Sequence, residues 1–290
     1  MGLSRTEKNK KNRKKIETKE KREKRKNFIL SFLKVFLAIL LIVLCISSYI
    51  FYISTDTLTV KEYSNTYTNL PNEFHGFKII QFGDLYYNKY YKSLFNKTIQ
   101  KINELKPDLV IFTGGLIHHK YSLNESEKEY IITNLKKINA TTGKYYVLSS
   151  SDNEDTISIL NEANFKFLDD STEEIYFNST TPIVLHGTMK NYKENKNSDK
   201  VFQINIVNNP NDIDNILNNN SPSIVMSGKA LNGQFRIPYY GGIIKKYKYI
   251  EPYYKIDKTD IYITSGLGTN NLPVRLFNHP SINFYRLKAK

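Results

Sequence analysis

The sequence predicts an α/β protein in which a domain with two sheets follows one N-terminal transmembrane helix. Three observations predict it: an apolar segment of membrane-spanning length, an alternation of strands and helices after residue 57, and a strand-rich second half after Phe165. Alternating strands and helices form parallel sheets with right-handed crossovers, and the later strands suggest a second sheet packed on the first. We therefore expect a basic tail at 1–26, a transmembrane helix at 27–53 and a domain at 57–290.

The apolar segment runs from Phe28 to Ile53 and carries no charge from Val35 onward. A helix needs about 20 apolar residues to cross the hydrocarbon core of a bilayer. A cleaved signal peptide is the alternative, but the segment is long for one and no small-residue cleavage site follows it. Leu44 before Cys45 disfavours lipoprotein processing. We expect an uncleaved single-pass anchor, and a domain without any cysteine for a disulfide, nucleophile or zinc site.

Positive charge is concentrated before the anchor. Residues 1–26 hold thirteen Lys or Arg and four Asp or Glu, which is +9 of the net charge of +14. The positive-inside rule places this end in the cytoplasm and the main domain outside the cell membrane. The tail is either a topology signal or a segment that binds anionic lipid. Because the rest of the chain carries only +5 and the tail lacks interleaved aromatic residues, no nucleic-acid partner is expected.

In the first half of the domain, apolar runs and helical spacing predict strands at 77–84, 108–115 and 144–152, with a short helix at 156–163. Phe95, Ile99 and Ile102 recur at i, i+4 and i+7, which is one buried face of a helix. This helix should end before Pro107, since proline cannot continue it.

A second helix is expected to begin at a capping box. Asn124 and Glu127 have the spacing in which each side chain accepts a hydrogen bond from the other residue's backbone N–H. Ile131, Leu135 and Ile138 then form the buried face of this helix.

The second half is rich in strands, which we expect at 174–177, 183–186, 202–207, 223–226, 260–264 and 282–286. These strands suggest a second sheet packed on the first. The Asn/Lys-rich stretch 190–200 is expected to be an exposed loop and not a domain boundary.

Five of the predicted strand ends lead into polar or glycine-rich loops: Gly83-Asp84, Gly114-Gly115, 149–152, 208–210 and Gly228-Lys229. Open sheets bind ligands just beyond the carboxyl ends of their strands. These loops therefore form the candidate site.

The order and local sequences of these segments resemble those of the calcineurin-like metallophosphoesterases, especially their membrane-attached bacterial branch. The resemblance runs from about Asn69 to Leu287, through LPNEFHGFKIIQFGDL, INELKPDLVIFTGG, GKYYVLSSSDN, SGKALNGQFRIP and SGLGTNNLPVRLFNHP. It implies a four-layer sandwich of two mixed sheets flanked by helices. It also implies the position of a two-metal phosphoesterase site.

At that site the chain departs from the family's pattern, which is Asp-x-His, Gly-Asp, Gly-Asn-His-Asp, a later His and Gly-His-x-His. The matching positions hold Asp84, Tyr86, Gly115, Ser150, Ser151, Asp152, Asn208, Lys229 and Leu231. Of the ligands, only Asp84 survives. One carboxylate cannot hold a pair of divalent ions. The departures imply a pseudoenzyme with no intact catalytic set and no metal cofactor, acting by binding or scaffolding at the cell envelope.

The alternative is an active phosphoesterase, hydrolysing phosphodiesters or phosphomonoesters, with a rebuilt site. Asp84, Asp152, His118 and His119, with His186, could then hold a divalent metal such as Mn, Fe or Zn. Bound metal and turnover would distinguish this enzyme from a binding protein.

Tyrosines suggest what a binding protein would bind, because their aromatic bodies and polar tips suit envelope glycans and partner proteins. They crowd the first site loop and the turn after the 223–226 strand: Tyr86, Tyr87, Tyr90, Tyr91, Tyr239 and Tyr240. We expect membrane lipid as a partner of the anchor and tail. An envelope glycan, a phosphate-containing ligand or a partner protein is the candidate partner of the domain.

Lys229 raises a specific hypothesis about Asp84. Its ammonium could take the volume of the lost metals and pair with the Asp84 carboxylate, while Leu231 closes the rest of the site. In the alternative, Lys229 points to solvent and Asp84 accepts hydrogen bonds from the backbone or from a tyrosine hydroxyl.

Overall fold

The structure is a computed structural model that describes the chain except for residues 1–4, 169, 188–199 and 270–271. The loop expected at 190–200 therefore lies outside the described residues, apart from Lys200, and so does the Asn270-Asn271 pair of the closing phrase. The chain divides into two compact units, Met1–Tyr49 and Ile50–Lys290, and each is described by itself.

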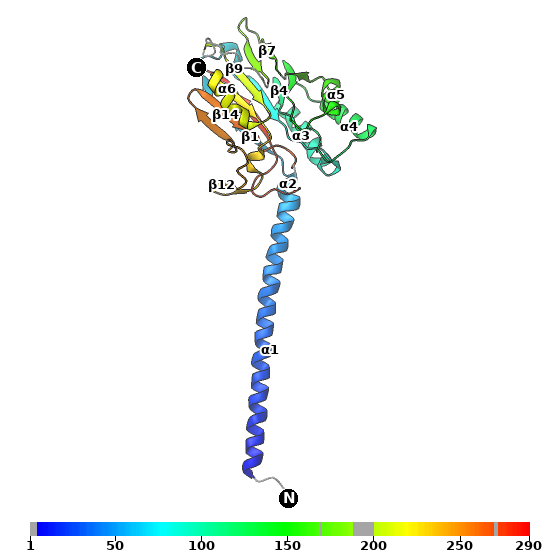
Figure 1. The fold of residues 1–290 in the computed structure, drawn as a ribbon, viewed down its shortest axis with the longest axis vertical. Coiled ribbons are helices and arrows are strands. Elements are labelled where there is room, and N and C mark those ends of the chain that lie inside the picture. Colours follow the sequence, from blue (N-terminus) through cyan, green and yellow to red (C-terminus); the bar gives the residue numbers. More distant parts are fainter. Residues whose placement is uncertain (1–4, 169, 188–199, 270–271) are drawn as a thin grey trace. The chain divides into compact units, whose positions relative to one another are not determined.

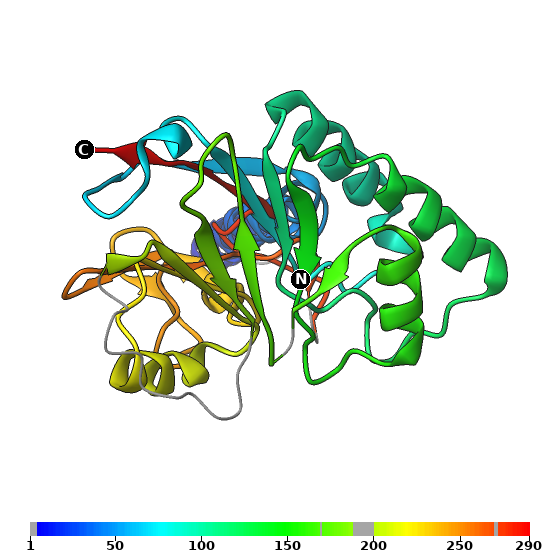
Figure 2. The same cartoon turned by 90° about the horizontal axis from the view of Figure 1, so that it is seen from above.

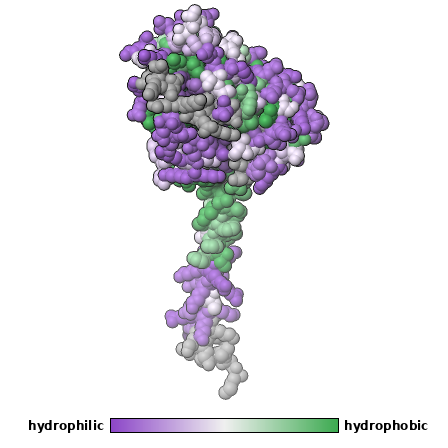
Figure 3. Space-filling model, turned by 45° about the horizontal axis from the view of Figure 1, so that its top comes forward, coloured by the Kyte–Doolittle hydropathy of each residue, from purple (hydrophilic) through white to green (hydrophobic). Residues whose placement is uncertain are grey.

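The first unit consists of the helix α1, Arg5–Ser48. Figure 3 shows a hydrophilic part of this helix followed by a continuous hydrophobic part. The apolar side chains from Phe28 to Ile46 are exposed along it, as a helix that faces lipid requires. By length and composition, one helix among the described residues could cross a membrane, which agrees with the expected anchor.

The second unit contains two six-stranded sheets. The first has the order β1 (Thr59–Tyr63), β15 (Ser281–Arg286), β3 (Lys78–Phe82), β4 (Leu109–Phe112), β5 (Gly143–Tyr146) and β6 (Lys166–Phe167). All its neighbours are parallel except β15 and β3. The strand predicted at 282–286 was grouped with the second sheet, but as β15 it lies inside the first.

The second sheet has the order β13 (Tyr253–Ile256), β14 (Thr259–Ile263), β10 (Ile224–Ser227), β9 (Gln203–Val207), β8 (Ile183–His186) and β7 (Thr172–Ile175). Its four central strands are parallel and both edge strands are antiparallel to their neighbours. Two small pairs complete the strands: β11 (Arg236–Ile237) with β12 (Gly241–Gly242), and β2 (Thr66–Tyr67) with β16 (Lys288–Ala289).

The helices of this unit are α2 (Ser54–Asp56), α3 (Lys92–Leu105), α4 (Glu125–Lys136), α5 (Glu154–Glu162) and α6 (Ile213–Asn219). Shorter helical turns are η1 (Tyr49–Ile53), which begins at the unit boundary, η2 (Asn72–Phe74), η3 (Lys89–Tyr91), η5 (Pro210–Asp212) and η6 (Leu231–Gly233). Figure 2 shows α3, α4 and α5 on the outer side of one sheet and α6 on the outer side of the other. The predicted fold, two mixed sheets flanked by helices, is confirmed.

Local sequence signals explain the helix boundaries. In α3, Phe95, Ile99 and Ile102 are buried as predicted, and Lys106 ends the helix in the left-handed conformation at φ 50°. The predicted capping box opens α4: the Glu127 backbone N–H donates to Asn124 Oδ1 at 2.9 Å, and the Asn124 N–H donates to Glu127 Oε2 at 3.1 Å.

The largest apolar clusters lie on the two faces of the first sheet. One packs α3, α4 and α5 against it, and the other fills the space between the two sheets with side chains such as Ile111 and Met226. A hydrogen bond crosses this second core: Gln81 Nε2 on β3 donates to the Ser227 carbonyl on β10 at 3.0 Å. The link fixes the position of the two sheets at the ends of β3 and β10.

Strand directions decide which end of the domain carries the site. Thr59, at the start of β1, pairs with Ser281 on β15, while Asn283 on β15 pairs with Gln81 near the end of β3. Because β3 runs opposite to β1 and β15, its carboxyl end lies level with the start of β1. Asp84 is thus at the end of the domain where the chain enters from the apolar segment.

Candidate functional site

Backbone hydrogen bonds hold the site loops together. The Asp84 N–H donates to the Gly114 carbonyl at 2.7 Å and the Tyr86 N–H donates to the Gly115 carbonyl at 2.9 Å. On the other side, the Gly268 N–H donates to the Asp84 carbonyl at 2.7 Å. The loops after β3, β4 and β14 therefore meet around Asp84.

The Asp84 side chain has no solvent exposure and is hydrogen-bonded on both oxygens. Oδ2 accepts the backbone N–H of Lys229 at 2.6 Å, and Oδ1 accepts the Tyr86 hydroxyl at 3.2 Å. Asp84 and Tyr86 both have positive φ, 49° and 44°, which non-glycine residues rarely adopt. The carboxylate is thus built into a strained loop.

Burial raises the pKa of Asp84 to about 7. The hydrogen bonds from Lys229 and Tyr86 and the Arg275 charge oppose this rise, while the charge of Asp152 adds to it. Burial likewise raises the pKa of Tyr86, and the neighbouring Asp84 carboxylate raises it further. The Tyr86 hydroxyl stays protonated and acts as a donor to Asp84.

Three glycines allow the chain to pass close to Asp84. A Cβ added to Gly115 would lie 3.0 Å from Asp84 Oδ1, one on Gly228 would lie 2.9 Å from Oδ2, and one on Gly266 would lie 2.8 Å from Asp84 Cβ. Real Cβ atoms essentially never lie under 3.0 Å from another heavy atom. The space beside the carboxylate is therefore filled by backbone, and a side chain at Gly115, which matches the aspartate of the family's Gly-Asp motif, would need Asp84 to shift.

The Lys229 ammonium does not pair with Asp84. It donates to Ser150 Oγ at 3.0 Å, near the surface, and only the Lys229 backbone reaches the carboxylate. Asp84 is satisfied by a backbone N–H and a tyrosine hydroxyl, as in the alternative set out for it. Leu231 is buried, and Gly266 lies so close that an added Cβ would be 2.4 Å from Leu231 Cδ2. This leucine fills the inner part of the site.

The Asp152 side chain binds the backbone of two site loops. Its carboxylate accepts the N–H groups of Gly115 at 2.8 Å, Leu116 at 3.0 Å and Ser149 at 2.8 Å. Burial raises the pKa of Asp152 and these three hydrogen bonds oppose the rise. It joins the loop after β4 to the loop after β5, and its acceptor sites are used by the protein itself.

Asn208 and the serines also make contacts within the protein. Asn208 Nδ2 donates to the Thr113 carbonyl at 2.7 Å, while its buried Oδ1 has no hydrogen-bond partner among the described residues. Ser151 Oγ lies 3.1 Å from Ser149 Oγ, and Ser150 receives the Lys229 ammonium. The positions matched to the family's site are thus gathered in one place with their polar groups largely bonded to each other.

The histidines of the alternative site form no metal-binding group with Asp84 among the described residues, although the His118 ring lies edge-on to the Tyr86 ring at 6.4 Å. The rings of His118 and His119 stack on each other at 4.5 Å, and His118 Nδ1 accepts the Lys120 N–H at 3.2 Å. His186 lies on β8, where its Nδ1 is 2.9 Å from Thr172 Oγ1 at the edge of the second sheet.

The tyrosine cluster divides into two sets. Tyr86, Tyr87 and Tyr91 are buried, so the expected binding surface at the first site loop is wrong for these three. Tyr239 and Tyr240 are fully or mostly exposed, and so is Tyr90: Tyr90, Tyr239 and Tyr240 remain available to a partner.

Arg275 is a site residue that sequence reasoning missed. Its side chain has no solvent exposure, and its guanidinium donates to the carbonyls of Ser265, Gly266, Gly268 and Asn278 at 2.5 to 3.2 Å. Burial lowers the pKa of Arg275 to about 10, so it stays charged at neutral pH and lowers the pKa of Asp84. In the sequence, only its position within the family-like segment LPVRLF pointed to Arg275.

Asn232 and Lys61 form a second pair that sequence reasoning missed, at the turn that contains Asn232 and Gly233. Asn232 is fully buried at φ 46°, donates to the carbonyls of Ile250 and Ile263, and accepts the Lys61 ammonium at 2.7 Å. Burial, together with the charges of Arg236 and Arg275, lowers the pKa of Lys61 to about 8. The turn ties β1 to the loop after β10.

Two known proteins are similar to this chain over most of its length. No protein-family model matches the chain. The protein named "Uncharacterized metallophosphoesterase YkuE" from Bacillus subtilis is 29% identical over 257 residues, which cover 82% of this chain and 88% of that protein. The chain is thus similar to a protein named as a metallophosphoesterase. A second such protein, "Uncharacterized metallophosphoesterase Cj0846" from Campylobacter jejuni, is 23% identical over 84% of this chain and 68% of its own length. The resemblance noted in the sequence is confirmed.

These relatives correct one expectation. The sequence led us to expect no metal cofactor, but both relatives are named as metallophosphoesterases, so a divalent metal is the cofactor associated with this group. The expectation of no metal cofactor is therefore wrong. It rested on motif residues alone.

The residues of the described site do not fit a two-metal centre. No three His, Cys, Asp or Glu side chains among the described residues lie close enough to hold a metal ion. Asp84 has no solvent exposure and both of its oxygens accept hydrogen bonds, while Asp152 accepts three backbone N–H groups, so both carboxylates are engaged by the protein itself. No hydrolytic step through such a centre can be derived from this arrangement.

Proposed function

We propose that this chain is a membrane-anchored protein of the phosphoesterase fold that acts by binding at the cell envelope and does not hydrolyse phosphoesters. One observation carries the proposal: the Asp84 carboxylate is enclosed, with one oxygen on the Lys229 N–H and the other on the Tyr86 hydroxyl. A catalytic carboxylate in this position would need free lone pairs toward solvent or substrate. Such an enclosed carboxylate argues against hydrolysis, whether or not the protein binds a metal.

The surrounding contacts support it. Gly115 stands where the family's Gly-Asp motif has its aspartate, and its missing side chain lets the backbone pass beside Asp84. Leu231 occupies the other side with an apolar side chain that offers no ligand atom. Arg275 supplies a buried positive charge close enough to lower the pKa of Asp84. The loops are thus stabilised by interactions within the protein.

The test uses the full-length chain purified in detergent and compared with Asp84→Asn. Hydrolysis of bis(p-nitrophenyl) phosphate and p-nitrophenyl phosphate is measured with added Mn, Fe or Zn, together with the metal content of the protein. We expect equal, background rates for the two proteins. Turnover that the Asp84→Asn substitution abolishes, with stoichiometric metal, would overturn the proposal, because a contaminating enzyme would survive the substitution.

For topology, we propose a cytoplasmic N-terminus and a domain outside the cell membrane. The supporting observations are the apolar helix and the thirteen basic residues before it. Protease added to protoplasts should then remove the domain at residues 57–290, while a fully protected domain would contradict this orientation. The candidate partners are membrane lipid at the anchor and tail, and an envelope glycan, a phosphate-containing ligand or a protein at the domain.

A further inference from the structure

The domain carries exposed apolar side chains where it follows the apolar segment. Phe51, Tyr52 and Ile53 are the last residues of that segment, belong to the second unit, and are all more than half exposed. β1 begins six residues after Ile53, a chain length that spans at most about 22 Å. The end of the domain at which β1 begins must therefore lie close to the bilayer if the segment is an anchor.

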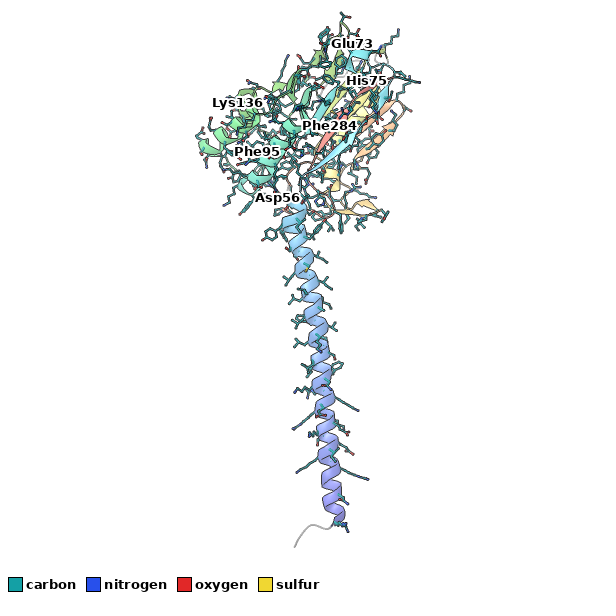
Figure 4. The ribbon with its side chains drawn as sticks, turned by 180° about the vertical axis from the view of Figure 1, so that it is seen from behind. Asp56, Glu73, His75, Phe95, Lys136 and Phe284 are labelled. Atoms are coloured by element: carbon teal, nitrogen blue, oxygen red, sulfur yellow. The ribbon has the colours of Figure 1, made fainter. Side chains whose placement is uncertain are left out.

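A second group of exposed side chains lies at the same end. The hairpin of β11 and β12, with the residues that follow it to Lys246, exposes Ile237, Tyr239, Tyr240, Ile243 and Ile244 by 46% or more. We refer to residues 236–246 as the hairpin surface. Figure 1 shows β12 and α2 at the same end of this unit, and in Figure 4 Asp56 of α2 lies at the opposite end from Glu73 and His75.

Side-chain contacts agree with this placement. The Lys61 ammonium on β1 binds Asn232 Oδ1, four residues before the start of β11. The Arg236 N–H donates to the Leu276 carbonyl at 2.9 Å, and the segment that follows enters β15 beside the start of β1. The hairpin surface is therefore attached to the strand that follows the apolar segment.

The charges of the hairpin surface are positive and partly unpaired. Arg236 pairs with Glu251, and the nearby Lys248 pairs with Asp214 at 2.8 Å. Neither Lys245 nor Lys246 makes an ion pair with any described residue. Lys245 Nζ instead lies 5.4 Å from the centre of the Tyr240 ring. Two exposed ammonium groups are thus free beside exposed aromatic and aliphatic side chains.

We propose that the hairpin surface binds the headgroup layer of an anionic bilayer, the same bilayer that holds the anchor. Tyrosine is enriched at the level of lipid headgroups, where its ring and hydroxyl match the two environments. Isoleucine side chains gain by leaving water for the boundary of the acyl chains, and lysines are attracted to anionic lipid. An exposed apolar patch of this kind marks an interaction site. The consequence is that the Asp84 end of the domain faces the membrane.

This proposal rests on the proposed membrane anchor, and the test separates the two. The chain contains no tryptophan, so a Tyr239→Trp substitution gives the full-length protein a single fluorescent reporter on the hairpin surface. Tyr176→Trp is the matched control: Tyr176 is 54% exposed and follows the carboxyl end of β7, which pairs with the start of β8 and so lies far from the site loops. Each variant is reconstituted in vesicles whose acyl chains carry bromine, which quenches tryptophan on contact.

With phosphatidylcholine and phosphatidylglycerol at three to one, we expect Trp emission from the Tyr239 variant to be blue-shifted and strongly quenched, and emission from the Tyr176 variant to be unaffected. Adding Lys245→Gln and Lys246→Gln to the Tyr239 variant should lower the docked-to-undocked ratio roughly 25-fold, about 5-fold for each lysine. Equal quenching of the two reporters, or equal quenching in phosphatidylcholine alone, would overturn the proposal. Vesicle flotation reports the anchor: a chain that fails to float overturns both proposals, whereas flotation without quenching overturns only this one.

Discussion

The Lys229 backbone N–H donates to Asp84 Oδ2 at 2.6 Å, while the ammonium of the same residue reaches Ser150 Oγ. A main-chain donor thus occupies the oxygen that a metal ion would need, and the side chain leaves the site. The left-handed conformation of Lys229, at φ 63°, turns its N–H inward and its side chain outward. Four predictions follow from the contacts around this bond.

Replacing Lys229 by Met should cost less than about 1 kcal/mol of unfolding free energy, because it removes one near-surface hydrogen bond and leaves the backbone donor to Asp84 in place. Urea unfolding of the full-length protein, followed by circular dichroism, measures the cost. Ser150→Ala is the matched control and should have a similarly small effect. A loss of 3 kcal/mol or more in the Met variant alone would mean that the ammonium is paired with the buried carboxylate after all.

Asp84 should make the protein less stable as pH rises from about 4 to about 7. The unfolded chain releases this proton near pH 4, whereas burial keeps it on the folded protein up to about pH 7. In that window the unfolded state binds fewer protons, so the unfolding free energy falls with rising pH, by at most about 1.4 kcal/mol for each pH unit.

The Asp84→Asn variant isolates this effect, because an amide does not titrate in this range and can donate to Tyr86 while accepting from Lys229. The unfolding free energy of the wild type should fall relative to that of the variant as pH rises from about 4 to about 7, and the difference should become constant only above about pH 8. Asp152, whose pKa is also raised, titrates in both proteins, and because its charge acts on Asp84, the variant removes the Asp84 titration together with this coupling. A pH-independent difference would show that the folded-state pKa of Asp84 is ordinary.

Gly115→Ala should destabilise the protein more than Gly76→Ala. Both glycines have positive φ, 75° and 86°, so each alanine bears a conformational cost of about 1 to 2 kcal/mol. A Cβ at Gly76 meets nothing within 4 Å, whereas at Gly115 it lies 3.0 Å from both Asp84 Cα and Oδ1. Thermal melting of the two variants compares them directly, and equal melting temperatures would show that the loop around Asp84 can relax.

Arg275→Met should cost about 3 kcal/mol or more, because it leaves the buried carbonyls of Ser265, Gly268 and Asn278 without their donor and removes a positive charge near Asp84. The Gly266 carbonyl keeps the Ser281 N–H as a second donor. Arg275→Lys should recover only part of this, since an ammonium cannot reproduce the planar fork of the guanidinium. Arg286→Met is the control: Arg286 is half exposed and its nearest ion-pair contact is 3.8 Å from Glu62. Similar chemical denaturation midpoints for the Arg275→Met and Arg286→Met proteins would refute a structural role for Arg275.

The sequence by itself determined the layers of the domain. The spacing of Phe95, Ile99 and Ile102 requires a helix with one buried face, and the Asn124 and Glu127 pair fixes where the next helix begins. These are local signals, carried by residues a few positions apart, so their geometry follows from helix periodicity and capping. The order of segments such as NGQFRIP and LPVRLF also indicated a resemblance to the metallophosphoesterases, and the names of the two similar proteins agree.

Only the tertiary structure decided how the site is filled. That Asp84 is satisfied by the Lys229 backbone, that Arg275 is buried beside it, and that β15 enters the first sheet all depend on residues far apart in the chain. Side-chain direction at Lys229 depends on a left-handed φ that its residue type does not predict. The sequence identified which residues meet at the ends of the strands, but packing determined which of their atoms face each other, because hydrogen bonds between distant loops leave no periodic trace in the sequence.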